Sequence, residues 1–95
     1  MNVNLTGARF VRCRAIEVNF IEARLADAAF TGSNLSGSTF DHCDLRKADF
    51  RDTQGLFIDP AKNRVKGARI DMAAAVLLAT SFGLRVSGFD EEIDS

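Results

Sequence analysis

The sequence predicts an all-β chain folded as a right-handed quadrilateral β-helix, with a short capping helix at its C-terminal end. Three observations lead to this prediction. A bulky apolar residue recurs at every fifth position through the first half of the chain, similar residues recur at every twentieth position, and one alanine- and leucine-rich segment lies near the C-terminus. At four repeats per coil, residues 1–70 make about three and a half coils.

The five-residue period defines the predicted core. A small residue or a thiol precedes nearly every bulky residue by two positions, and Ala15 alone interrupts the bulky series. The core positions predicted from this period are Leu5, Phe10, Phe20, Leu25, Phe30, Leu35, Phe40, Leu45 and Phe50, continued by Val65 and Ile70. The small partners include Ala8, Cys13, Ala23, Ala28, Ser33, Ser38, Cys43 and Ala48.

A period of five fits neither an α-helix nor a single strand, whose periods are 3.6 and 2. It suits a coil with four equivalent sides, in which two side chains of each repeat point inward and three point outward. Successive coils would stack at the spacing of paired strands, about 4.8 Å. The alternative, an amphipathic helix bundle, would need a different period and fewer Gly, Ser and Thr residues.

The twenty-residue period tests the four-sided coil within the sequence itself. Positions twenty apart should stack, and they hold the same residue type. The columns are Leu5, Leu25 and Leu45; Phe10, Phe30 and Phe50; Phe20 and Phe40; and the small column Ala8, Ala28 and Ala48.

Tandem units of this kind resemble a known family. The stretch ADAAF-TGSNL-SGSTF-DHCDL-RKADF is similar to pentapeptide-repeat proteins, and the clear run covers residues 3–53. The resemblance implies a rigid solenoid that acts through its surfaces.

Residues 54–64 (QGLFIDPAKNR) interrupt the pattern. Gly55 and Pro60 fall at the next two central positions, and neither supplies a core side chain. The apolar residues at 56–58 are expected to fold back over the coil. Because Val65 and Ile70 restore the register, we interpret the segment as an irregular half-coil within a solenoid of residues 1–70.

Residues 71–95 are predicted to form a capping and dimerisation helix, a short strand and an acidic tail. Asp71 is a suitable N-cap, residues 72–82 are strong helix formers, and Gly83 is the expected C-terminal stop. Met72, Val76, Ala79 and Phe82 are expected to cover the coil. A helix that is apolar on more than one face predicts a second contact. The predicted homodimer residues are Ala73, Leu77, Leu78, Leu84 and Val86.

The C-terminal stretch VKGARIDMAAAVLLATSFGLRVSGF resembles the end of the bacterial quinolone-resistance pentapeptide proteins. In that family the C-terminal segment forms the dimer and the rod mimics duplex DNA on DNA gyrase and related topoisomerases. The resemblance implies the dimer role for residues 72–86. The sequence departs from that pattern in its short length and in its charge, since residues 1–70 carry 11 Lys/Arg against 8 Asp/Glu, a balance of +3.

The first coil is expected to be open. Val11, Ile16 and Ile21 lie at outward positions on three consecutive sides, where later coils carry polar residues. Either something covers this end, or the chain is the C-terminal part of a longer rod, or these are scattered surface apolar residues of the ordinary kind.

The sequence offers no set of residues typical of an enzyme, a metal site or a cofactor site. His42 is the only histidine and lies at an outward position; Cys13 and Cys43 lie at inward positions, where we expect buried thiols without a disulfide. Lys62, Arg64, Lys66 and Arg69 form a basic cluster, from which we do not expect direct nucleic-acid binding. With no long apolar segment and no apolar leader, we expect a cytoplasmic protein without a membrane partner.

The sequence therefore predicts a non-enzymatic protein-interaction module, a rigid homodimeric rod. Two alternatives stay open: a DNA-mimicking modulator of DNA gyrase, and a truncated or engineered repeat scaffold.

Overall fold

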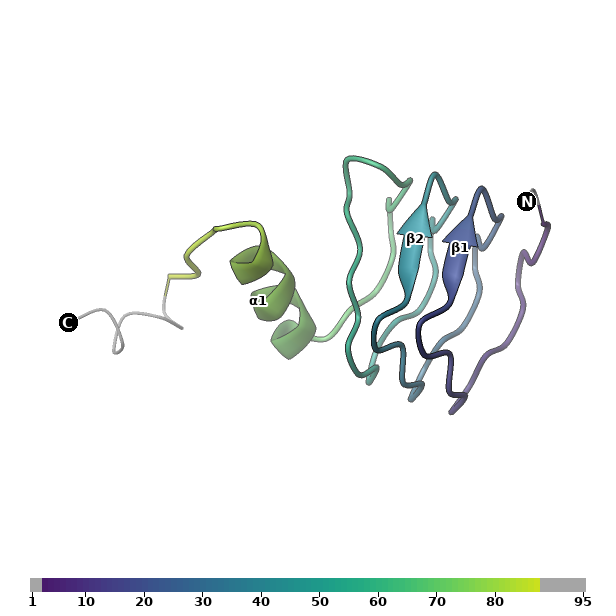
Figure 1. Ribbon diagram of the computed structural model, residues 1–95, viewed down its shortest axis with the longest axis horizontal. Helices are drawn as coiled ribbons and strands as arrows, with labels where there is room; N and C mark the ends of the chain where they lie inside the picture. Colours follow the sequence, from purple (N-terminus) through teal and green to yellow (C-terminus); the bar gives the residue numbers. More distant parts are fainter. Residues whose placement is uncertain (1–2, 88–95) are drawn as a thin grey trace.

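The fold is a β-helix solenoid, seen in a computed structural model that describes residues 3–87. Two strands, β1 (Asn19–Ile21) and β2 (Thr39–Asp41), pair in parallel with a register of twenty residues. Isolated parallel bridges extend the same register to the other sides, for example from Arg24 to Asp44 and from Asp44 to Arg64. We call each twenty-residue stretch a coil; the coils lie one behind another along the molecule (Figure 1).

The stacked phenylalanines form the centre of the solenoid. Phe10 lies on Phe30 with ring centroids 5.0 Å apart, and Phe30 lies on Phe50 at 4.9 Å, both nearly parallel. Phe20 and Phe40 form a second stack at 4.8 Å. The two stacks meet edge to face, at 6.0 Å between Phe30 and Phe40. The predicted stacking of phenylalanine on phenylalanine is confirmed, and both geometries are favourable for aromatic rings.

Burial of the predicted core residues depends on their coil. Six are buried and lie in the middle coils: Leu25, Phe30, Leu35, Phe40, Leu45 and Phe50. Five are only partly buried and lie towards the two ends: Leu5, Phe10, Phe20, Val65 and Ile70. A central side chain therefore needs a coil on each side of it to lose its remaining contact with water.

The corners of the coil are tight turns with a positive φ two positions after the central residue. Ser38 N–H donates to the carbonyl of Leu35 at 3.0 Å, which closes a four-residue turn of type II. In this turn Gly37 has a φ of 73°, and a Cβ there would lie 3.0 Å from Cγ of Glu17. Non-glycine residues take the same conformation at Arg12, Glu17, Glu22, Asp27, His42, Lys47 and Asp52.

Two inward serines tie successive coils together. Ser33 Oγ accepts from the N–H of Cys13 at 2.9 Å and donates to the carbonyl of Phe10 on the preceding coil. Ser38 repeats this arrangement one side further along. Both serines are buried, and each hydroxyl is satisfied as both acceptor and donor, so neither leaves a costly unpaired polar group in the core.

The irregular segment 54–64 replaces central side chains with apolar residues from other positions. Ile58 is 5% exposed and belongs to the core, and Leu56 packs against the core, as the sequence predicted. The same prediction is wrong for Phe57, which is 43% exposed. Gly55 has a φ of 66°, and a Cβ there would lie 2.6 Å from Cα of Ser36. The backbone therefore passes too close to the previous coil for any side chain at this position.

Helix α1 (Met72–Ser81) begins after Asp71 and lies beyond the last coil, at the end of the molecule opposite the first coil (Figure 1). Asp71 has the extended backbone of an N-cap, but its side chain makes no capping hydrogen bond. After the helix, Gly83 has a φ of 82°, and Leu84 N–H donates to the carbonyl of Ala79 at 2.9 Å, a Schellman ending. No described helix is long and apolar enough to cross a bilayer.

Two expectations for this end are wrong. Residues 84–86 are not part of a β-strand. Met72 does not cover the coil, since it is 84% exposed in the first turn of α1. The acidic tail, residues 88–95, lies outside the described residues.

Candidate functional site

The end of the molecule that carries α1 exposes a group of large apolar side chains. Their exposed fractions are 84% for Met72, 70% for Leu77, 62% for Leu84, 44% for Phe82 and 43% for Phe57. Large apolar side chains gathered on one part of a surface are typical of a contact with another molecule. We call these five residues the apolar end.

The residues predicted for the dimer contact do not all lie on the surface. Ala73, Leu77 and Leu84 are exposed, whereas Leu78 and Val86 are half-buried. Ala73 and Leu77 are four positions apart, so they lie on one face of α1. Met72, Phe57 and Phe82, which the sequence did not assign to this contact, are exposed at the same end of the chain.

Three observations describe how α1 is held. Asp71 accepts a hydrogen bond through Oδ2 from the N–H of Asp52, one coil earlier. Phe82 contacts Phe57 of the irregular segment, with ring centroids 5.6 Å apart. Val76 is the buried residue of the helix, at 8% exposure. The apolar end is therefore formed by α1 together with the segments on either side of it.

A second candidate surface is a charged row on one side of the solenoid. The bridges place Arg24, Asp44 and Arg64 in line on three successive coils. Asp44 is paired with Arg46 in its own turn: Nε donates to Oδ1 at 2.8 Å and Nη2 donates to Oδ2 at 2.6 Å. Asp49 and Arg51 repeat this two-pronged contact on the next side.

Both carboxylates are held in the charged form. The hydrogen bonds from Arg46 lower the pKa of Asp44 to about 2, with further help from the charge of Arg64. In the same way Arg51 lowers the pKa of Asp49. The two pairs are therefore ionised at any physiological pH, and each is close to neutral as a unit.

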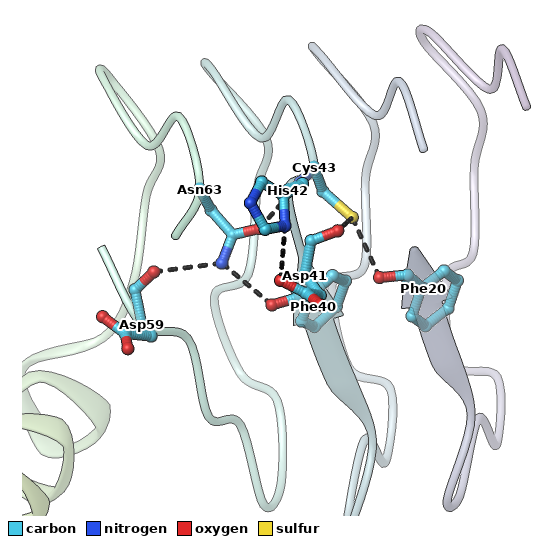
Figure 2. Close-up of polar contacts among 7 residues, drawn as sticks. All are labelled: Phe20, Phe40, Asp41, His42, Cys43, Asp59 and Asn63. Carbon is cyan, nitrogen blue, oxygen red and sulfur yellow. Dashed lines mark hydrogen bonds and ion pairs between the residues drawn. The ribbon is translucent and has the colours of Figure 1, made fainter. Parts of the chain in front are cut away.

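An open hollow of about 500 Å³ lies beside the charged row, bounded by residues 22–24, 42–44 and 61–64. Two of the residues that line it, Cys43 and Asn63, belong to a network of polar contacts (Figure 2). Asn63 Oδ1 accepts from the N–H of Cys43 at 2.8 Å, and Asn63 Nδ2 donates to the carbonyls of Phe40 and Asp59 at 2.9 and 3.0 Å. Asn63 thus acts in this coil as the serines do elsewhere.

The thiols and the histidine differ in their surroundings. Cys43 is buried, and its Sγ lies 3.1 Å from the carbonyl of Phe20. Cys13, expected to be buried, is exposed, because no described segment covers the first coil. The side chain of His42 is 72% exposed, with Nδ1 2.7 Å from Oδ1 of Asp41 (Figure 2). Among the described residues no group of three or more His, Cys, Asp or Glu could hold a metal ion.

The first coil also exposes apolar side chains. Ile16, Val18 and Ile21 are 39%, 38% and 45% exposed, and Val11 is half-buried. Val11, Ile16 and Ile21 were singled out in the sequence. Val18 lies two positions before Phe20, an inward position of the five-residue period, and like Cys13 it is exposed in the first coil.

Comparison with known proteins gives a family match. The family model described as pentapeptide repeats matches residues 1–37 and 23–54, with eight copies of the repeat. No curated protein matches the sequence. The match was expected from the five-residue period.

Several solved structures are similar to this chain. QnrB1, a plasmid-mediated fluoroquinolone resistance protein, is 28% identical over 90% of this chain and 42% of its own, with a TM-score of 0.47. A pentapeptide-repeat protein from the thylakoid lumen of Arabidopsis thaliana is 20% identical over 84% of this chain and 77% of its own, with a TM-score of 0.44. Rfr23 from the cyanobacterium Cyanothece 51142 is 21% identical over 76% of this chain and 49% of its own, with a TM-score of 0.35. The chain thus spans less than half the length of QnrB1.

Proposed function

This chain belongs to the pentapeptide-repeat family, and on that premise we propose that it is a non-enzymatic protein-interaction module that works as a rigid homodimeric rod. The observation that carries the proposal is the apolar end. Leu77, on a helix with one buried residue, is 70% exposed, and Leu84, which follows the helix, is 62% exposed. Covering a leucine side chain contributes about 1.5–3 kcal/mol, so a partner that covers both would be bound favourably.

The partner at the apolar end is a second copy of the chain. A two-fold contact uses the same patch twice, so each exposed side chain contributes two times. Ala73 and Leu77 offer one helix face for this contact, and Leu84 extends it past the Schellman turn. Leu78 and Val86 contribute their partly exposed surface.

The finer features of the rod belong to this proposal as well. They are a right-handed winding, about three and a half coils in residues 1–70, and a capping role for α1 over the last coil. The cytoplasm is the proposed location, in keeping with two cysteines that form no disulfide framework in the sequence.

A modulator of DNA gyrase that mimics duplex DNA is the second candidate function. It is favoured by the sequence from Val65 to Phe89, which resembles the end of the quinolone-resistance pentapeptide proteins. Charge favours the first candidate, because a DNA mimic needs a mainly acidic surface whereas residues 1–70 are net positive by three charges.

Replacement of Leu77 by glutamate tests the dimer. Each dimer would lose two buried leucines, about 2 kcal/mol each, so Leu77→Glu should weaken dimerisation roughly a thousandfold. Light scattering and sedimentation should then report a monomer at concentrations where the unmodified protein is a dimer. Leu77→Ala, a milder change, should give an intermediate dissociation constant with an unchanged circular dichroism spectrum.

The matched control is Gln54→Glu, which adds the same charge at an exposed position of the solenoid. It should remain a dimer. A dimer that survives Leu77→Glu would contradict the proposed contact, and a monomeric unmodified protein would contradict the homodimer altogether.

Inhibition of gyrase supercoiling separates the two candidate functions. If the dimer has no effect on supercoiling at micromolar concentration, the gyrase modulator is excluded and the interaction module remains the proposed function. Dose-dependent inhibition that is lost in Leu77→Glu would favour the gyrase modulator.

A further inference from the structure

Three cations, Arg24, Lys62 and Arg64, line the hollow beside the charged row. The side chains of Arg24, Lys62 and Arg64 form no hydrogen bond or ion pair within residues 3–87. All three are exposed and line the hollow. The neighbouring Arg46 is paired with Asp44 and so adds no free positive charge to the hollow.

The hollow carries a surplus of positive charge. Asp44, in its middle, is already neutralised by Arg46, which binds both carboxylate oxygens. Glu22 is the other carboxylate on the lining. Three unpaired cations therefore face one unpaired anion, and the excess lies towards the last coil, where Lys62 and Arg64 flank Asn63.

Several donors that line the hollow are already used by the fold. The amide of Asn63 is fully used, and the N–H groups of Asp44 and Arg64 donate to carbonyls of the preceding coil at 3.0 Å each. The exposed cations of the rim are therefore the groups that would recognise a ligand. Guanidinium groups at such a rim favour carboxylates, which they bind through two parallel hydrogen bonds.

We propose that this hollow is a docking site for an acidic polypeptide segment, whose carboxylates pair with Arg64 and Lys62 on the last coil and with Arg24 two coils earlier. The inference rests on the proposed function, since it gives the interaction module a second face and a partner chemistry. Arg24 and Arg64 are two coil spacings apart, about 10 Å. Acidic residues two or three positions apart in an extended segment span about 7–10 Å, which the long arginine side chains can match.

The charge pattern selects a polypeptide over a nucleic acid. Along the row the signs alternate from Arg24 to Asp44 to Arg64. A duplex presents one negative charge about every 1.7 Å, so its phosphates would lie against Asp44 and Glu22 as well as against the cations. A peptide can place its carboxylates at the cations alone.

Fluorescence anisotropy with a labelled decapeptide of alternating glutamate and serine tests the site on the full chain. Binding should weaken with rising salt, because it depends on partly exposed charges. The double variant Lys62→Gln plus Arg64→Gln should raise the dissociation constant at least tenfold, which corresponds to a loss of about 1.4 kcal/mol of binding free energy. Arg24→Gln should raise it less.

The matched control removes two charges elsewhere, through Arg12→Gln plus Arg14→Gln, and should change the dissociation constant less than twofold. Equal weakening by both double variants would overturn the site, because it would show an effect of net charge alone. Tighter binding of a 20-base-pair DNA duplex than of the peptide, lost in the Lys62 and Arg64 variant, would also overturn it.

Light scattering on the same samples distinguishes a failure of the docking site from a failure of the proposed homodimer. If the peptide fails to bind a protein that is still a dimer, the docking site is wrong and the homodimeric rod stands. If the unmodified protein binds the peptide as a monomer, the docking site stands and the dimer is wrong.

Discussion

At the scale of single residues, the aspartate–arginine pairs two positions apart are a repeated local device. In each turn the carboxylate accepts from the backbone N–H of the arginine, at 3.2 Å for Asp44 and 3.0 Å for Asp49, as well as from its guanidinium. The pair thus fixes the turn and neutralises a cation in one step. Since the two side chains of the Asp44 pair are 21% and 48% exposed, solvent weakens the attraction and its contribution to stability is modest.

The Asp44 pair predicts a low titration midpoint. A carboxyl whose pKa is lowered by folding stabilises the fold above its unfolded pKa, about 3.9, and that contribution is lost as the pH falls through the folded value, about 2. Carbon-detected NMR of the side-chain carboxyl should therefore show Asp44 titrating near pH 2. In Arg46→Gln the midpoint should rise towards 3.9, roughly the value of an isolated aspartate. A midpoint near 4 in the unmodified protein would contradict the pairing.

Residue patterns predicted the inward positions better than the outward ones. The series from Leu5 to Phe50 could be identified because burial demands a large side chain at each central position. The turn residues were not predicted, because arginine, glutamate and lysine seldom take a positive φ. Only the glycines at 7, 32, 37 and 67 mark these corners in the sequence. Nor could the sequence show that Asp44 and Arg46 form a direct ion pair, since alternating charges are equally typical of a solvated surface without pairing.

At the scale of elements, Asp71 links the last regular coil to α1. The sequence predicted it as a helix cap, and its backbone has that conformation, yet its carboxylate accepts from Asp52 on the preceding coil. A side chain that would otherwise start the helix is used to hold it against the solenoid.

Removal of the Asp71 carboxylate should loosen this link. Asp71→Ala should lower the free energy of unfolding by about 1 kcal/mol, the usual net contribution of one such hydrogen bond. Urea denaturation followed at 222 nm measures the change. Asp71→Asn retains an acceptor and should lose less. An Asp71→Ala protein as stable as the unmodified one would show that the Asp52 contact contributes nothing.

The ends of α1 were predictable, whereas its surroundings were not. A run of alanine and leucine followed by Gly83 sets the limits of the helix through local energetics alone. Which of its faces would be covered depends on the path of residues 54–64, where Phe57 meets Phe82, and no periodicity describes that path. The same reason explains why Met72 was wrongly expected to cover the coil.

At the scale of the whole molecule, stability is expected to vary along the axis. Phe30 has a phenylalanine stacked on each side and is fully buried, whereas Phe10 is stacked on one side and half-buried. In a solenoid each coil is stabilised mainly by its neighbours, so a coil with one described neighbour opens more easily than a coil with two.

Hydrogen exchange should detect this gradient. The N–H of Phe10 donates to the carbonyl of Ala29, and the N–H of Phe30 donates to the carbonyl of Asp49. Both are backbone hydrogen bonds to the next coil, so the two amides differ only in their position along the solenoid. The Phe30 amide should exchange at least about tenfold more slowly, since sub-global opening of the first coil exposes Phe10 alone. Equal rates for both amides would instead indicate that the solenoid opens as one unit.

The twenty-residue register also decides how such a chain can change its length. An insertion of twenty residues between Asp44 and Arg64 would add one complete coil and return every later residue to its original side. An insertion of five would advance everything after it by one side of the square, so Arg64 would leave the row of Arg24 and Asp44, and α1 would leave the rod from a different face. Length changes in whole coils therefore alter the reach of the rod and preserve the relative orientation of its surfaces, whereas single repeats rotate one surface against the other by a quarter turn.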